Sequence, residues 1–166
     1  FGGWTGDHPE EEWSENPITV TMDEDKEITA KFVKTVALTM RKNGEGSTSP
    51  AVGEHTYTNG TKVKIEAKPA NGWKFDGWTG NVSEEDWNTN PLEIEMDSDK
   101  TITANFVKTF TLTMGKNGEG STSPAVGEHT YTKGTKVKIE AKPANGWTFG
   151  GWTGDYPEEE WSENPI

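Results

Sequence analysis

The chain has 166 residues, of which 28 are acidic and 16 are Lys or Arg, and its formal net charge is −12. This acidity argues against nucleic acids and anionic membrane surfaces as partners, because both require a positively charged patch. The absence of cysteine excludes a disulfide framework and a thiolate metal site. No apolar run approaches the roughly 18 residues of a membrane-spanning helix, so we expect no membrane insertion in this segment.

The first 34 residues contain two β-rich runs, 18–22 and 28–33. The polar stretch 23–26 between them is typical of a hairpin turn. Ahead of both runs, Pro9 is followed by three glutamates, a pattern suited to the first turn of a helix. We therefore expect two strands joined by a tight turn, preceded by one helical turn.

From residue 35 onward the pattern is again that of strands. Residues 36–40 and 75–78 are short apolar runs, and 43–46 supplies glycines for a tight reversal. Residues 61–68 alternate strictly between apolar and charged side chains, which predicts a strand with one buried face. The buried face would carry Val63, Ile65 and Ala67, and the exposed face Lys62, Lys64, Glu66 and Lys68.

The strongest feature of the sequence is a repeat with a period of 74 residues. Phe1–Gly6 returns at 75–80 and at 149–154, and residues 1–74 match 75–148 at 55 of 74 positions without a gap. An active site is usually made once per chain, whereas a spacer, a stalk or a multivalent binder is made many times. The period therefore favours an array over an enzyme.

A unit of 74 residues is near the lower limit for an independent hydrophobic core, so neighbouring units are expected to support one another. We predict an all-β chain of tandem units. Each unit would contain five or six short, mainly antiparallel strands and one short helical turn.

Three motifs follow one another in each unit. The first is Leu-Thr-Met, a glycine-rich loop and Ser-Thr-Ser-Pro; the second is Gly-Thr-Lys-Val-Lys-Ile-Glu-Ala-Lys-Pro, Asn-Gly-Trp and Phe-x-Gly-Trp; the third is Met-Asp-x-Asp-Lys-x-Ile-Thr-Ala-x-Phe-Val. This ordered series resembles the divergent InlB B-repeat family, tandem modules of secreted and surface proteins of bacteria and archaea. The resemblance covers the whole chain.

The resemblance implies a β-grasp-like module at an extracellular or cell-surface location; a small sandwich is the alternative fold. In the phase of the family, residues 1–34 are the C-terminal half of a repeat, 35–108 a complete repeat, and 109–166 the N-terminal part of a third. The family implies no catalytic residues and no cofactor.

Tryptophan is the main candidate for ligand binding, because exposed Trp beside acids or amides can stack on sugar rings. Five of the eight lie next to glycine on short strands and are expected in the core: Trp4, Trp73, Trp78, Trp147 and Trp152. The other three lie amid acids. Trp13, Trp87 and Trp161 could cap the core, pack on a neighbouring unit or bind a ligand.

Other candidate chemistry is weaker. Catalysis by the glutamates Glu10, Glu11 and Glu12 would need a second carboxylate across a cleft, for which a small β unit has little room. Asp23 and Asp25, with their copies at 97 and 99, lack the further ligands of a Ca²⁺ loop, so we expect a solvated turn. His55 and its copy His129 are too few for a zinc site.

Charge suggests how units could meet. Lys62, Lys64 and Lys68 form a basic strand face, which Lys136 and Lys138 continue in the next copy, whereas Glu10 to Glu12 form an acidic turn. We hypothesise that the basic face of one unit meets the acidic turn of another unit or chain. Because each exposed pair contributes about 0–1 kcal/mol, only summation over many copies would matter.

We expect a structural, non-catalytic function: a semi-rigid stalk or self-assembling fibre of an extracellular surface protein. Its partners would be neighbouring repeats and other copies of itself. The linker Val33–Thr35 leaves little room for a hinge. The alternative is a multivalent adhesin module that binds glycans or host glycoproteins through Trp13, Trp87 and Trp161.

Overall fold

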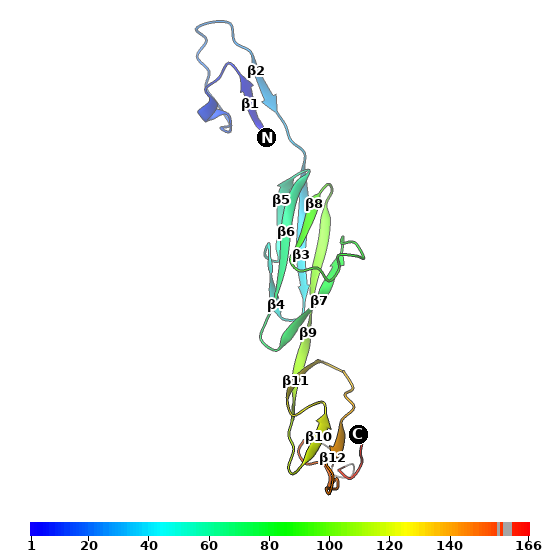
Figure 1. Ribbon diagram of the computed structural model, residues 1–166. Coiled ribbons are helices and arrows are strands. Elements are labelled where there is room, and N and C mark those ends of the chain that lie inside the picture. Colours follow the sequence, from blue (N-terminus) through cyan, green and yellow to red (C-terminus); the bar gives the residue numbers. More distant parts are fainter. Residues whose placement is uncertain (156, 158–160) are drawn as a thin grey trace. The chain divides into compact units, whose positions relative to one another are not determined.

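The computed structural model describes residues 1–155, 157 and 161–166. Figure 1 shows these residues as short strands and one 3-10 turn, so the predicted all-β class is confirmed. In chain order the elements are β1 (Gly3–Gly6), η1 (Glu10–Glu12), β2 (Ile28–Lys31), β3 (Thr35–Asn43), β4 (Gly46–Ser49), β5 (Gly53–Thr58), β6 (Thr61–Pro69), β7 (Trp73–Gly80), β8 (Leu92–Met96), β9 (Lys100–Met114), β10 (Gly120–Ser123), β11 (Gly127–Thr132) and β12 (Glu140–Pro143).

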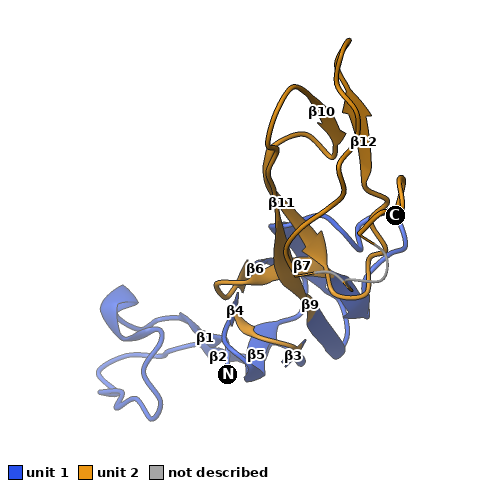
Figure 2. Ribbon diagram, turned by 90° about the horizontal axis from the view of Figure 1, so that it is seen from below, with its two compact units in different colours: residues 1–42, 47–67, 77–104 blue, residues 43–46, 68–76, 105–166 orange. Residues whose placement is uncertain are grey.

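The chain divides into two compact units, coloured separately in Figure 2. The first contains residues 1–42, 47–67 and 77–104, and the second contains residues 43–46, 68–76 and 105–166. Strand β9 supplies residues to both units, because it is the last strand of the central repeat and continues as the first strand of the next.

Two sheets build the central repeat. Strands β4, β6 and β8 form a three-stranded sheet with β6 in the middle. Strand β3 lies between β5 and β9 in the other sheet, and β9 also pairs with β7 and β11. The architecture is therefore the small sandwich, rather than a sheet covered by a helix as in a β-grasp.

The core lies between the inward faces of these sheets. Alternation in β6 places Val63, Ile65 and Ala67 inward, as predicted. Side chains from the other strands cover them because each strand has the same period of two. The buried partners are Val36, Leu38 and Met40 of β3, Trp78 of β7, Leu92, Ile94 and Met96 of β8, and Ile102 and Ala104 of β9.

The register of β6 with β8 keeps charge out of this core. Val63 lies opposite Ile94, and Lys64 lies opposite Glu93 on the outer face. A slip of one residue would turn the charged side chains inward and the apolar ones outward. The pattern of the two strands therefore specifies a single register.

The turn between β8 and β9 corrects one prediction. Residues 97–100, like their copy 23–26, were expected to close a hairpin, but β8 and β9 belong to different sheets. The turn instead carries the chain from one sheet of the sandwich to the other. Local turn chemistry is the same in both cases, so the sequence pattern could not distinguish them.

The copy of β8 in the first repeat also departs from expectation. Residues 18–22 form no strand, although their pattern resembles that of β8. The reason is that β8 pairs with β6, and residues 1–34 contain no counterpart of β6. Met22 is accordingly 71% exposed, whereas its copy Met96 is fully buried.

In the third copy, most of the counterpart of β6 forms no strand. Only Glu140–Pro143 of the β6 counterpart forms a strand, and it pairs with β10. Beyond it, Ile139 and Ile166 exchange two backbone hydrogen bonds of 2.7 and 3.0 Å. These two residues are the copies of Ile65 and Leu92, so the register of the complete repeat is retained at this point.

Equivalent leucines should therefore differ in their contribution to stability. Leu38 is fully buried, and Leu38→Ala should lower the free energy of unfolding by about 2–5 kcal/mol because it leaves a cavity. Its copy Leu112 is only half-buried, and Leu112→Ala should cost less. Urea denaturation of both variants measures the difference; equal losses would contradict this account of the core.

Candidate binding surface and repeat junction

A tryptophan on β7 holds the acidic loop that follows the strand, residues 81–91. The Trp78 backbone N–H donates to the Trp87 carbonyl at 2.6 Å, and the Trp78 indole N–H donates to the Thr89 carbonyl at 2.9 Å. Its side chain is buried, as predicted. The same backbone bond joins Trp4 to Trp13 and Trp152 to Trp161 in the other copies, so the loop is held in the same way each time.

The burial of the other four tryptophans that were expected in the core differs from one repeat to the next. Trp4, Trp73 and Trp152 are half-buried, and Trp147 is 53% exposed although it was expected in the core. The ring of Trp147 lies over Gly118, as that of Trp73 lies over Gly44. The third copy lacks a counterpart of Phe106, the aromatic residue that packs beside Gly44 in the complete repeat.

The three candidate ligand-binding tryptophans lie at the loop. The ring of Trp87 is 48% exposed, and it packs on Gly77 so closely that a side chain there would collide with it. Trp13 is exposed, and its indole N–H donates to the His8 carbonyl at 3.3 Å. Trp161 is half-buried. Each therefore has a structural contact and some accessible surface.

The glutamates of this loop are exposed. Glu10, Glu11 and Glu12 form the 3-10 turn η1, which confirms the predicted helical turn. In the complete repeat Ser83 caps the equivalent turn, because its Oγ accepts from the Asp86 N–H at 3.2 Å. The third copies of these glutamates, at 158–160, lie outside the described residues.

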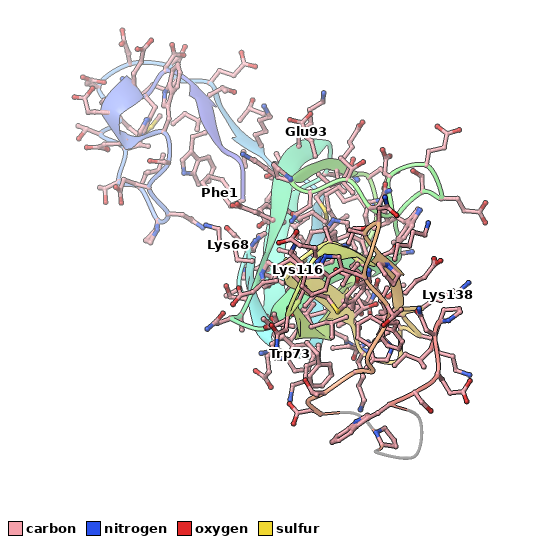
Figure 3. All side chains as sticks on the ribbon, turned by 60° about the horizontal axis from the view of Figure 1, so that its bottom comes forward. Phe1, Lys68, Trp73, Glu93, Lys116 and Lys138 are labelled. Atoms are coloured by element: carbon pink, nitrogen blue, oxygen red, sulfur yellow. The ribbon has the colours of Figure 1, made fainter. Side chains whose placement is uncertain are left out.

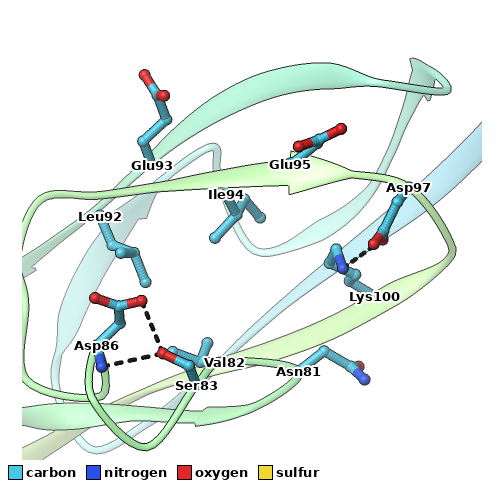
Figure 4. Close-up of a pocket in the computed structure, with 10 residues that line it drawn as sticks. All are labelled: Asn81, Val82, Ser83, Asp86, Leu92, Glu93, Ile94, Glu95, Asp97 and Lys100. Atoms are coloured by element: carbon cyan, nitrogen blue, oxygen red, sulfur yellow. Dashed lines mark hydrogen bonds and ion pairs between the residues drawn. The ribbon is translucent and has the colours of Figure 1, made fainter.

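A shallow cavity of about 240 Å³ lies between this loop and β8 (Figure 4). Figure 4 shows Leu92 and Ile94 on the opposite side of β8 from Glu93 and Glu95. A similar cavity of about 220 Å³ occurs at the equivalent place in the first copy. In the cavity of Figure 4, polar side chains of the lining bond to one another: the Ser83 hydroxyl donates to Asp86, and Lys100 bonds to Asp97.

The aspartates that were expected in a solvated turn, rather than in a Ca²⁺ loop, hold the turn between the sheets. Asp97 accepts from the Lys100 ammonium at 2.6 Å, which holds the pKa of its carboxyl below the ordinary value. Asp99 accepts from the Ala37 N–H at 2.8 Å and so ties the turn to β3. In the first copy, the hydrogen bond between Asp23 and Lys26 lowers the pKa of the aspartate and raises that of the lysine.

The histidines also have structural partners. His55 donates to the Ala51 carbonyl at 2.6 Å, and His129 donates to the Ala125 carbonyl at the same distance. Within the described part of the chain, no group of three or more His, Asp or Glu side chains is placed to hold a metal ion.

The lysine face is a ladder of mixed charge rather than a basic patch. Lys62 lies opposite Glu95 and Lys64 opposite Glu93 on the outer face of the three-stranded sheet. The Lys62 ammonium lies 3.2 Å from Glu93, whose exposed position is visible in Figure 3. Lys136 and Lys138 are exposed but lie outside any strand. Charge pairing within the sheet therefore reduces the capacity of Lys62 to attract the acidic turn of another unit.

Two asparagines with a clear role were missed from sequence. The Asn90 amide accepts from the Ala67 N–H at 2.9 Å and donates to the Ala67 carbonyl at 2.8 Å, as a paired strand would. Asn164 makes the same two bonds with Ala141. The repeated Asn-Pro dipeptide was the available signal. These amides fix the end of the acidic loop to β6 and its copy.

Aromatic side chains pack closely near the junction between the central repeat and the next. Phe106 of β9 is only 6% exposed, and its ring covers Gly46, where an added Cβ would lie 2.6 Å from Cζ. Phe75 meets Phe106 edge-on, with ring centroids 6.3 Å apart. Three residues along, the Thr109 N–H donates to the Gly72 carbonyl at 2.8 Å. The glycines of the loop thus provide a close approach as well as a turn.

The preceding junction has nearly the same sequence but another structure. Phe32 is 80% exposed, and residues 32–34 form no strand, although Phe32–Thr35 is identical to Phe106–Thr109. The first copy has no counterpart of Gly44, Gly46 or Trp73 to receive the ring. Because the linker sequence is the same in both places, the continuity of β9 goes with the packing of Phe106 on the glycine loop of its own repeat.

The model of the divergent InlB B-repeat domain matches the chain three times, over residues 1–36, 35–109 and 110–164. No curated protein and no solved structure was found to match the chain. Among the residues that the structure describes, no helix is long and apolar enough to cross a bilayer.

The lowered pKa of Asp97 predicts a loss of stability in acid. Since the folded pKa lies below the ordinary 3.8, the ion pair contributes fully above pH 3.8 and its contribution disappears as the pH falls through the folded value. Asp97→Asn should therefore flatten the decline of the melting temperature below pH 4. Asp76→Asn, at an exposed carboxylate on β7, is the control and should leave that slope unchanged.

Proposed function

The chain belongs to the divergent InlB B-repeat family, whose members are usually found in surface or extracellular proteins, and we propose that it serves as a semi-rigid stalk segment of such a protein. A repeat module of a surface protein needs no chemistry of its own. Its task in this proposal is to hold whatever lies beyond it at a distance set by the number of repeats.

The observation that carries the proposal is the continuity of β9. One 15-residue strand ends the sandwich of the central repeat and begins the next repeat. The buried Phe106 and the hydrogen bond from Thr109 to Gly72 fix the backbone on both sides of the point where one repeat ends and the next begins. A linker whose residues are paired and packed has little freedom to bend, in contrast to a flexible loop.

The proposal includes the absence of catalysis. The acidic loop, the turn aspartates and the histidines each bond to the backbone or to a neighbouring side chain of the same repeat. What remains exposed is charged surface together with individual apolar side chains, both aromatic and aliphatic. Such a surface suits a soluble spacer outside the cell.

Length measurements test the stalk. Polypeptides with one to four tandem copies of residues 35–108 should show maximum dimensions in X-ray scattering that rise by a constant increment per copy. A square-root dependence on copy number would indicate flexible joints and would contradict the proposal.

A glycine at the junction provides the sharper prediction. Gly46→Ala should displace the Phe106 ring, lower the free energy of unfolding by about 1–3 kcal/mol and broaden the scattering-derived distance distribution of the tandem polypeptides. Gly115→Ala is the matched control, because nothing lies within 4 Å of its added Cβ. Equal effects of the two substitutions would show that the packing does not stiffen the joint.

The exposure of Trp87 supports one alternative, a multivalent module that binds glycans. Packing on Gly77 orients the indole while 48% of the residue stays accessible. If this role holds, glycan-array binding by the intact chain should be lost in Trp87→Ala and retained in Trp73→Phe. Absence of any glycan bound by the intact chain would remove the alternative and leave the stalk.

A further inference from the structure

The chain enters and leaves the complete repeat on neighbouring strands. The repeat begins with β3 and ends with β9, and these two strands lie side by side in one sheet. The Ala37 N–H donates to the Asp99 carboxylate at 2.8 Å. The Asn43 amide donates to the Asn105 amide oxygen at the same distance. Both bonds join residues 62 positions apart, which identifies parallel strands, because in an antiparallel pair the separation changes along the ladder. Figure 1 shows β3 and β9 running in the same direction through the repeat.

Parallel neighbours place the entry and the exit of the repeat at opposite ends of one strand pair. Tension along the chain therefore pulls β3 by its first residue and β9 by its last, in opposite directions along their length. The two strands can separate only by sliding, which breaks the hydrogen bonds between them together. In an antiparallel pair loaded at one end, by contrast, the bonds open in sequence and each bears the load alone.

Sliding of these strands would also disrupt the core of the sandwich. Both strands carry fully buried side chains on their inward faces: Leu38 and Met40 of β3, and Ile102 and Ala104 of β9. Each side chain would leave its neighbours as its strand moved, and apolar surface would be exposed while the backbone bonds break. The barrier to separation therefore combines backbone hydrogen bonding with core packing.

Side-chain contacts reinforce the pair near both of its ends. Asp99 directly precedes β9 and holds the beginning of β3, whereas Asn43 is the last residue of β3. One position further, Gly44 approaches Phe106 so closely that an added Cβ would lie 2.5 Å from the Phe106 carbonyl oxygen. The two strands are therefore tied beyond the ladder of hydrogen bonds that joins them.

We propose that β3 and β9 form a load-bearing clamp, which keeps the complete repeat folded when tension is applied along the chain. The source of the tension rests on the proposed stalk function, whereas the clamp itself is a property of the single repeat. Because β9 continues for 15 residues into the following repeat, the load passes from one repeat to the next without an intervening loop.

Pulling the intact chain in two directions with optical tweezers tests the clamp. Because the chain has no cysteine, DNA handles can be attached to introduced pairs of cysteines at exposed positions. Thr35→Cys with Lys108→Cys loads β3 and β9 along the clamp. Thr35→Cys with Thr58→Cys instead loads the end pair of the antiparallel strands β3 and β5. At the same loading rate, the unfolding force should be several-fold higher in the first direction, because forced unfolding reports the barrier to separation.

A side-chain variant separates the clamp from general stability. Asn43→Ala should lower the unfolding force along the clamp and leave the force between residues 35 and 58 unchanged. Ser83→Ala, which removes a bond within the acidic loop, should leave both forces unchanged. Equal forces in the two directions, or an equal proportional drop of both in Asn43→Ala, would overturn the clamp. The scattering-derived length of tandem polypeptides does not depend on the clamp, so either proposal can fail without the other.

Discussion

The structure depends on the pairing of β6 with β8, two strands that are separated by β7 and the acidic loop. This pairing creates the inner face of the three-stranded sheet, on which the sandwich core is built. Where both strands are present, Met96 is buried; where the β6 counterpart is missing, the equivalent Met22 is exposed. Because non-local strands are stabilised mainly by what they pack on, a half-repeat keeps local turns and loses its core.

Most of the polar and aromatic side chains that could have served a ligand instead hold loops and turns of the repeat in place. Trp78 and Asn90 hold the acidic loop, and Asp97 and Asp99 hold the crossing between sheets. A domain near the lower size limit has few apolar side chains, and fixed loops reduce the conformational freedom of the remainder. Sequence positions that looked suited to ligands thus contribute to the integrity of each repeat.

The junction links folding to the role in a surface protein. Phe106 closes one repeat on Gly44 and Gly46 while its strand begins the next, so neighbouring repeats share a structural element. At this junction the two repeats are therefore joined by a continuous strand rather than by a separate linker.

The sequence by itself determined the period, the family, the all-β class, the buried face of residues 61–68 and the helical turn after Pro9, because each follows from residue patterns along the chain. Only the tertiary structure decided that residues 97–100 cross between sheets, that Glu93 and Glu95 lie opposite the lysines of β6, and that Gly46 receives Phe106. These features join segments far apart in the chain. The identical stretches at 32–35 and 106–109 show the physical reason: the same residues form a loop or a strand according to whether an earlier segment of the same repeat offers a surface for the phenylalanine ring.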